Sequence, residues 1–255
     1  QKTSFSRKFP QLFLSLSAFA MILFLGERIV NTSMFRIQAV NISGEEQLSA
    51  SSIRHLSNIR FNQHLFLFDE KQAEHWIEEH PWVSDATVRT TFPNTIEIEV
   101  VEQQPTMLLA LEKLWYINQS GNIFREADKN DLNYPIVTGI PQKWKDQHSN
   151  ILVRVLHEAL LVQQACDVSF LGGTENISEI NFHTKTGFRV ILRNGVIITF
   201  GFYEPKSRVD RLRKMIEKGL DISIPQKIIL DADTVAISKP LTKLEQPNSH
   251  VLESP

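Results

Sequence analysis

Many side chains in this sequence could bind metals or transfer protons, but their spacing does not assemble a catalytic site. The 255 residues include eight histidines, and none forms a His-x-x-x-His pair, which would place two imidazoles on one helix face. His75 and His80 are five residues apart, so a helix would point them in different directions. Asp231 and Asp233 would share one face of a strand, but the sequence indicates no pocket around them. We expect no metal centre and no acid-base pair.

Motifs for nucleophilic catalysis or cofactor binding are also missing from the sequence. It has no Gly-x-Ser-x-Gly, no Ser-x-x-Lys, no phosphate-binding loop and no Gly-x-Gly-x-x-Gly. The single cysteine, Cys166, continues a 3,4,3,4 apolar spacing from Leu152, which predicts a buried thiol on a helix face rather than a reactive one. We therefore expect a protein without catalytic residues or cofactors, whose function is binding.

The charge of the chain does not favour a nucleic-acid partner. The net charge is -2 at pH 7, so no bulk field attracts phosphates. The expected helix from Lys206 to Gly219 is locally basic, but acidic residues partly balance its charge and its apolar positions follow helical spacing, as on ordinary surface helices. Its cationic side chains are expected to point mostly outward: Lys206, Arg208, Arg211, Arg213, Lys214 and Lys218.

An uncharged apolar run near the N-terminus predicts a membrane anchor. Residues 9–26 contain no charged side chain, and with Ile29 and Val30 the run reaches the roughly 20 residues that span a bilayer. Lys2, Arg7 and Lys8 precede it, so residues 1–8 are expected in the cytoplasm and the rest outside. A cleaved signal peptide is the alternative, because Ala18-Phe19-Ala20 has the form of a cleavage site, but cleavage there would discard half of the run. The chain begins with Gln rather than Met, which leaves room for further cytoplasmic residues.

The pattern over residues 35–105 predicts a small β-α-α-β-β module. Residues 35–44 suit a strand with a bulge at Ile37, and Ser49 and Asp69 are candidate caps of two helices. Pro81 disfavours helical geometry at His80 and ends the second helix there. A hairpin follows, with its turn at 92–95 and alternating apolar positions on both sides. We expect two helices on one face of a three-stranded sheet.

The end of this module resembles a known family. The stretch HPWVSDATVRTTFPNTIEIEVVEQQP, residues 80–105, is similar to the end of the POTRA domain in the bacterial cell-division family FtsQ, called DivIB in Gram-positive bacteria. The family has a His-Pro-Trp-Val, an Arg, a Pro turn and a Val-Glu-x-x-Pro in this order. The matching residues are His80, Pro81, Trp82, Val83, Arg89, Pro93, Val101, Glu102 and Pro105.

Residues 106–238 predict a second module, a mainly antiparallel β-domain with a few helices. Strand pairs are expected before Gly121, an amphipathic helix over 150–166, and a hairpin around Asn194-Gly195, one of the strongest hairpin signals. Residues 228–237 predict a final strand or strand pair. The polar residues 239–255 are expected to be disordered. This order matches the β-domain of the FtsQ family, so the predicted fold class is α+β after a single transmembrane helix at 9–30.

The resemblance implies a function and partners. It implies a non-catalytic, single-pass inner-membrane scaffold at the division septum that links early and late division proteins and helps to regulate septal peptidoglycan synthesis. In the family the C-terminal strand of the β-domain receives FtsB, which comes with FtsL, and the POTRA domain and anchor contact other division proteins. The residues that would bind the partner are Ile229, Leu230, Asp231, Thr234, Val235, Ala236, Ile237 and Lys185.

The final strand departs from the family pattern, because Ala232-Asp233-Thr234 follows Asp231 where the family has Leu-Arg-Tyr. Two alternatives remain open: a POTRA protein of outer-membrane assembly or secretion, and a membrane-anchored cell-wall enzyme. The first would need many strands of a membrane barrel after Pro105, and the second a nucleophile with a base, or a metal site. An exposed edge strand fits the binding function, because unpaired backbone groups can accept a partner strand.

Overall fold

The computed structural model describes residues 14, 16–24, 33–128, 133–202, 204–230 and 237–240. The chain divides into two compact units, Gln1–Gln103 and Gln104–Pro255. Each unit contains its own sheet and its own apolar core.

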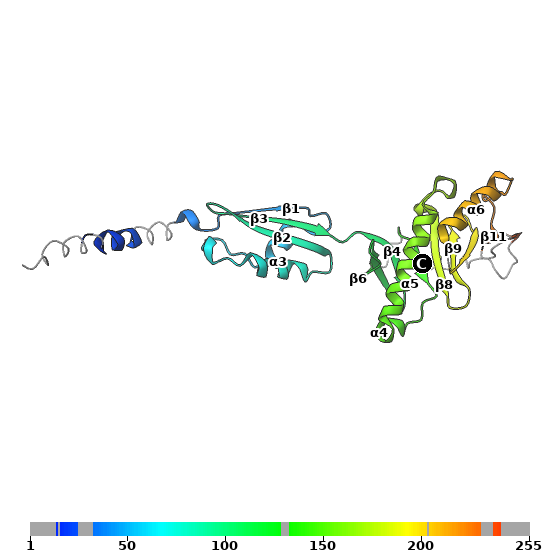
Figure 1. The fold of residues 1–255 in the computed structure, drawn as a ribbon, viewed down its shortest axis with the longest axis horizontal. Helices are drawn as coiled ribbons and strands as arrows, with labels where there is room; N and C mark the ends of the chain where they lie inside the picture. The colour runs from blue at the N-terminus through cyan, green and yellow to red at the C-terminus, as the bar shows by residue number, and fades with distance from the viewer. Residues whose placement is uncertain are drawn as a thin grey trace, which may run out of the picture. The chain divides into compact units, whose positions relative to one another are not determined.

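The first unit has the expected β-α-α-β-β order. Its three-stranded sheet has the order β1-β3-β2, with β1 parallel and β2 antiparallel to β3. The two helices and the sheet enclose a core that includes Ile53, Ala73, Ile77, Val88 and Ile98, and the ribbon of this unit can be followed in Figure 1. Its elements are η2 (Ser33–Phe35), β1 (Ala39–Ser43), α2 (Ala50–Leu56), η3 (Leu65–Leu67), α3 (Glu70–Glu78), β2 (Val83–Thr91) and β3 (Thr95–Glu102).

Both predicted helix caps of this unit are confirmed. Ser49 accepts a hydrogen bond from the backbone N–H of Ser52, and Asp69 accepts one from that of Gln72 at 3.0 Å. The predicted bulge is wrong: β1 pairs with β3 without a register shift, and Ile37 lies before the strand, where it is fully buried. Apolar spacing alone could not separate a bulged strand from a strand preceded by a buried residue.

The second unit contains one nine-stranded sheet with the order β12-β11-β10-β9-β8-β7-β4-β5-β6. Its strands are β4 (Pro105–Ala110), β5 (Leu114–Asn118), β6 (Ile123–Glu126), β7 (Ile136–Thr138), β8 (Ile177–His183), β9 (Gly187–Leu192), β10 (Ile197–Gly201), β11 (Gln226–Ile229) and β12 (Ile237–Pro240). Its helices are α4 (Trp144–Gln147), α5 (Ser149–Cys166), η4 (Ser169–Leu171), η5 (Thr174–Asn176) and α6 (Pro205–Glu217).

The expectation of an antiparallel sheet is corrected to a mixed one. The pairs β4–β7, β7–β8 and β10–β11 are parallel, and the other pairs of this sheet are antiparallel. For two of the three parallel pairs the cause lies in helical connections, because β7 reaches β8 through α4 and α5, and β10 reaches β11 through α6. A helical crossover returns the chain to the same end of the sheet, so the next strand runs parallel. The Asn194-Gly195 turn joins β9 and β10 as an antiparallel hairpin, as predicted.

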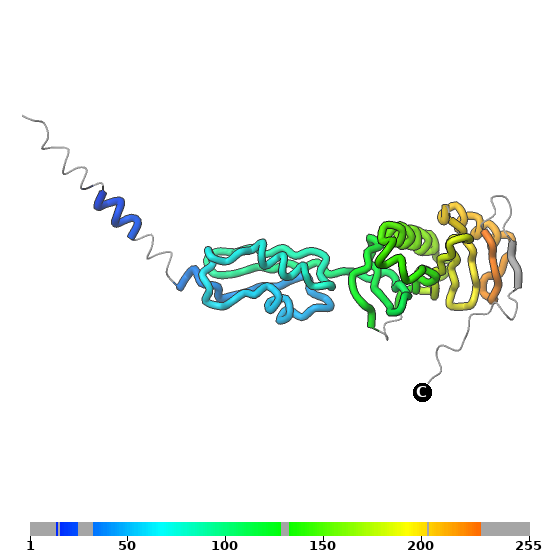
Figure 2. The backbone as a smooth tube through the Cα atoms, turned by 90° about the horizontal axis from the view of Figure 1, so that it is seen from below, coloured from blue at the N-terminus to red at the C-terminus, as the bar shows by residue number. Residues whose placement is uncertain are grey.

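The long helices cover one face of this sheet. Figures 1 and 2 show α5 and α6 on the same side of the strands, and both helices contribute to the core that contains Leu156, Cys166 and Leu212. The outward placement of Arg208 is wrong, because its side chain is buried. In the sequence this arginine looked like the other cations of α6, but it precedes Val209 on the side of the helix that packs inward.

The expected transmembrane segment at 9–30 lies mostly outside the described residues. Residues 14 and 16–24 are helical, and their large apolar side chains are exposed. Within the described residues, no helix combines the length and the apolarity that crossing a membrane requires. Residues 1–8 and 241–255, expected to be a cytoplasmic segment and most of the disordered tail, also lie outside the described residues.

Candidate partner-binding edge

Four strands form the edges of the two sheets: β1 and β2 in the first unit, β12 and β6 in the second. An edge strand carries backbone N–H and C=O groups that point away from its sheet, so a strand from another chain can pair with it. The side chains around each edge decide whether those groups remain accessible.

The β2 edge is closed by three glutamates of α3. Glu70, Glu74 and Glu78 are four residues apart, so they lie along one face of the helix. Their carboxylates accept hydrogen bonds from the backbone N–H groups of Thr90 (2.6 Å), Val88 (2.9 Å) and Ala86 (3.4 Å), respectively. This arrangement was not predicted, although the i, i+4, i+8 spacing of the three glutamates is visible in the sequence. In the first unit, this leaves β1 as the edge without such a cover.

The β12 edge is the candidate site of the second unit. β12 pairs antiparallel with β11, from Ile237 opposite Ile229 to Pro240 opposite Gln226, and no described strand pairs with its other side. The interpretation of Lys239-Pro240 as the start of a disordered tail is therefore wrong, because both residues belong to β12. A proline has no backbone N–H and is tolerated on edge strands.

The predicted partner-binding residues differ in their surroundings. Ile229 is the last residue of β11 and is half-buried, whereas Leu230 is fully buried and donates its N–H to the carbonyl of Thr199 at 2.9 Å. Ile237 begins β12. The remaining four, Asp231, Thr234, Val235 and Ala236, lie in the connection from β11 to β12, outside the described residues.

Lys185 lies at the same end of the sheet as this connection. It is exposed in the turn between β8 and β9, where its N–H donates to Nδ1 of His183 at 3.2 Å. The β9 residue Phe188 pairs with Gly201 at the end of β10, and β11 runs parallel to β10. The β8–β9 turn, the end of β11 and the start of β12 therefore lie at one end of the sheet. The sequence could not predict this because it requires the strand order.

Gly187 allows two strands to meet closely beside this turn. Its φ is +73°, and a Cβ atom there would lie 2.1 Å from the carbonyl carbon of Gly201. Any other residue would collide with the β10 backbone and also strain its own. The close approach fixes the position from which Lys185 extends.

The residues of the His-Pro-Trp-Val motif form the connection from α3 to β2. α3 ends at Glu78, shortly before the predicted end at His80. Nδ1 of His80 faces the N–H of Trp82 at 3.3 Å, and the carbonyl of His80 accepts the N–H of Val83 at 2.8 Å. Trp82 and Val83 are buried, and Pro81 is exposed. The motif is thus a tight turn that is held by its own hydrogen bonds.

The later motif residues have different surroundings. Arg89 is exposed on β2 opposite Glu97, and Pro93 is exposed in the β2–β3 turn. Glu102 is buried, and its carboxylate accepts the backbone N–H groups of residues 46, 47 and 48 at 3.1, 2.7 and 2.9 Å. It holds the loop before α2 in place. Pro105 is the first residue of β4 and pairs with Asn118 in the second unit.

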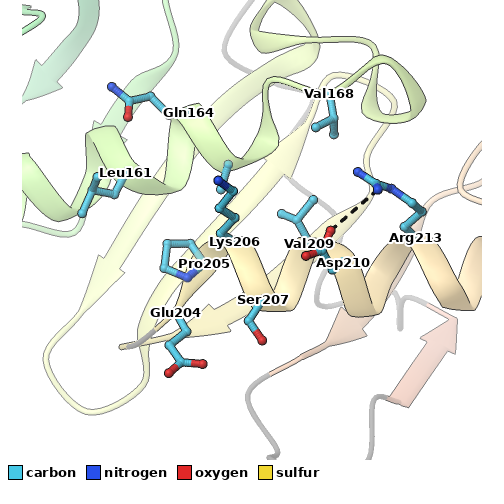
Figure 3. A pocket seen from close by; sticks show the side chains of 11 residues that line it. Leu161, Gln164, Val168, Glu204, Pro205, Lys206, Ser207, Val209, Asp210 and Arg213 are labelled. Atoms are coloured by element: carbon cyan, nitrogen blue, oxygen red, sulfur yellow. Dashed lines mark ion pairs between the residues drawn. The ribbon is translucent and has the colours of Figure 1, made fainter.

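A pocket of about 670 Å³ lies between α5 and α6. Figure 3 shows Lys206 extending toward α5 and an ion pair between Arg213 and Asp210, whose Nη1 and Oδ1 atoms are 3.7 Å apart. Ser207 also lines the pocket, but the described lining residues include no histidine that could act as its base. The pocket contains no recognisable catalytic set.

The remaining candidates for chemistry are placed as follows. No three His, Cys, Asp or Glu side chains in the described parts of the chain are grouped to hold a metal ion. Cys166 is fully buried, and this burial raises the pKa of its thiol to about 12. The thiol is therefore neutral and inaccessible at ordinary pH, as the helical spacing predicted.

The fold defines a class of protein: a POTRA-like β-α-α-β-β unit followed by a mixed β-sheet domain with helices and an edge strand at its C-terminal end. Residues 35–103 match the family described as "POTRA domain, FtsQ-type", and residues 109–232 match "Cell division protein FtsQ/DivIB, C-terminal". The chain belongs to the FtsQ/DivIB family of cell-division proteins.

Individual relatives agree with this assignment. The chain is 24% identical over 225 residues to cell division protein FtsQ of Syntrophotalea carbinolica, which covers 84% of this chain and 80% of the relative. It is 26% identical over 225 residues to FtsQ of Geotalea daltonii, with 83% and 78% covered. Cell division protein DivIB of Macrococcus caseolyticus is 25% identical over 163 residues, or 63% of this chain and 54% of the relative.

Membership of the family decides between the alternatives that the sequence left open. FtsQ/DivIB proteins are non-catalytic division proteins, so the chain is neither a cell-wall enzyme nor a component of outer-membrane assembly. The family also implies a membrane protein of the division site with partners in the division machinery.

Proposed function

We propose that this chain is a bitopic scaffold of the divisome. A strand of FtsB, which is accompanied by FtsL, pairs with the β12 edge. Through this contact the chain links early and late division proteins and helps to regulate septal peptidoglycan synthesis. The observation that carries the proposal is the position of β12, which ends a nine-stranded sheet with one side unpaired among the described strands.

The neighbourhood of β12 supports strand addition at this place. A partner strand beside β12 would extend a sheet that already has eight further strands and a large apolar core, so it would add to a rigid template. Lys185 is exposed at the end of the sheet where β12 begins. Its ammonium group could pair with a carboxylate that follows the added strand.

The N-terminal segment supports a membrane anchor at residues 9–30. In its described part, residues 14 and 16–24, every large apolar side chain is exposed. Exposed apolar surface of this kind is stable in lipid and unfavourable in water. With three basic residues before the run, we propose a cytoplasmic N-terminus, with both folded units in the periplasm.

The POTRA-like unit is proposed to contact other membrane proteins of the divisome. The glutamates of α3 cover the β2 edge, so a strand would add at β1. The motif residues His80, Trp82, Val83 and Glu102 shape the unit, whereas Arg89 and Pro93 are exposed and accessible to a partner.

Two truncations test the β12 proposal. A chain that ends at Leu230 loses β12 but keeps β11 and the buried Ile228 and Leu230. A control chain that ends at Pro240 keeps both strands. The first chain is expected to fold but to lose co-purification of FtsB and FtsL, whereas the control keeps both. A folded chain ending at Leu230 that still captures FtsB would refute the proposal, and circular dichroism establishes folding.

A further inference from the structure

One end of the first unit has a group of exposed or half-buried apolar side chains that its core does not use. We name Met34, Phe35, Phe66, Leu67 and Phe92 the apolar patch. Between 53% and 78% of the surface of Met34, Phe66, Leu67 and Phe92 is exposed. The Phe66 ring lies 5.3 Å from the Phe35 ring and 5.6 Å from the Phe92 ring, measured between centroids. The aromatic members therefore form one contiguous surface rather than scattered residues.

The patch is built on three segments that the backbone ties together. Ile37 donates its N–H to the carbonyl of Gln63 at 2.9 Å and accepts the N–H of Asn62 at 3.0 Å. Gln38 donates to the carbonyl of Asn94 at 2.9 Å, next to the turn that carries Phe92. The patch is thus held in place before any partner arrives, and contiguous exposed apolar surfaces mark interaction sites.

The chain itself brings this patch close to the membrane. Met34 follows Val30, the last residue of the proposed anchor, by four positions. Four extended residues span at most about 14 Å, and the headgroup layer on each side of a bilayer is roughly 5–8 Å thick. The patch therefore cannot lie far from the lipid surface. Peripheral membrane segments bury Phe and Leu side chains at this depth, at the boundary between headgroups and acyl chains.

The charges around the patch also suit a lipid surface. The three segments, residues 33–38, 60–68 and 92–94, contain Arg36, Arg60 and His64 but no aspartate or glutamate. Charged residues make up 22% of the whole chain, with acids slightly in excess, so this end differs from the rest. Both arginines are exposed. Anionic headgroups attract arginines near the surface.

We propose that the apolar patch is a membrane-contact surface: its side chains enter the interface of the same bilayer that holds the anchor. The contact fixes the direction in which the POTRA-like unit stands on the membrane. This inference rests on the proposed anchor at 9–30. It goes beyond that proposal because it assigns a lipid-binding role to a folded unit outside the membrane.

The test measures the depth of individual residues in vesicles. The full chain with Cys166→Ala carries one new cysteine, Phe66→Cys or Phe92→Cys, labelled with the environment-sensitive dye NBD. It is reconstituted in vesicles of phosphatidylethanolamine and phosphatidylglycerol, with and without lipids that carry a nitroxide either near the headgroup or deep in the acyl chain. Val101→Cys is the matched control, because Val101 is also apolar and 52% exposed but lies at the other end of β3. Ile22→Cys reports on the anchor.

A blue-shifted, nitroxide-quenched signal at 66 and 92 with an unshifted signal at 101 is expected. Quenching at 22 without quenching at 66 and 92 would overturn the membrane contact and leave the anchor intact. Absence of quenching at all four positions would overturn both proposals. A blue shift at 66 and 92 without quenching would show that protein covers the patch, which also overturns the lipid assignment.

Discussion

The buried carboxylate of Glu102 should be a main support of the POTRA-like unit. Its Oε1 accepts the N–H groups of Glu46 and Leu48, and its Oε2 accepts that of Gln47 at 2.7 Å. In Glu102→Gln one oxygen becomes an N–H₂ donor. In either orientation of the new side-chain amide, its NH₂ group then faces at least one of the three buried backbone N–H groups, which are also donors.

The expected cost follows from these contacts. A hydrogen bond to a charged group contributes about 1.5–3 kcal/mol, and an unsatisfied buried donor adds a penalty of similar size. Glu102→Gln should therefore destabilise the unit by at least about 2 kcal/mol. In a unit of this size 1 kcal/mol corresponds to roughly 4–8 °C, so its unfolding midpoint should fall by roughly 8–16 °C.

Thermal unfolding followed by circular dichroism and hydrogen exchange of the chain measure this effect. The amides of Glu46, Gln47 and Leu48 should exchange faster in Glu102→Gln. Glu99→Gln is the matched control, since Glu99 is exposed on the same strand, and it should change neither quantity. An unchanged midpoint and unchanged exchange in Glu102→Gln would show that the three hydrogen bonds to Glu102 do not stabilise the unit.

Three further predictions concern other parts of the chain. Glu74→Ala should raise the exchange rate of the Val88 amide and cost about 1 kcal/mol, and Lys71→Ala, on the exposed side of α3, should leave that amide protected. The thiol of Cys166 has its pKa raised from 9.0 to about 12, so iodoacetamide at pH 8 should label the unfolded chain only. Because folding raises this pKa, the contribution of the buried thiol to folding stability is complete below pH 9 and disappears between pH 9 and 12. A denaturation midpoint that is constant between pH 9 and 12 would contradict the burial of the thiol. Gly187→Ala should cost at least about 3 kcal/mol, whereas Gly219→Ala, with φ +102° and open space around its Cβ, should cost only about 1–2 kcal/mol in denaturant unfolding.

Local features were predictable from the sequence because they depend on neighbouring residues. Ser49 and Asp69 could be identified as helix caps because each stands directly before the first residue of a segment with helical apolar spacing. The Asn194-Gly195 hairpin depends on a glycine with φ +85°, which the turn type requires. The apolar spacing that ends at Cys166 identified the buried face of α5.

Features that depend on strand order were not predictable in this way. The parallel pairs β7–β8 and β10–β11 follow from where the crossover helices return, which no local pattern encodes. The role of Glu102 depends on a loop more than 50 residues earlier. The sequence around Lys239 and Pro240 has the composition of a polar tail, and these residues form a strand because they pair with Lys227 and Gln226 of β11.

Hydrogen exchange on the full chain, with and without the periplasmic part of FtsB, tests whether a partner strand adds to β12. If FtsB adds a strand to β12, the amides of Ile237, Ser238 and Lys239 that point away from β11 become hydrogen-bonded and exchange more slowly. Those of β6, the opposite edge of the same sheet, should not change. Protection at β6 or β1 with β12 unchanged would show that FtsB does not add a strand to β12.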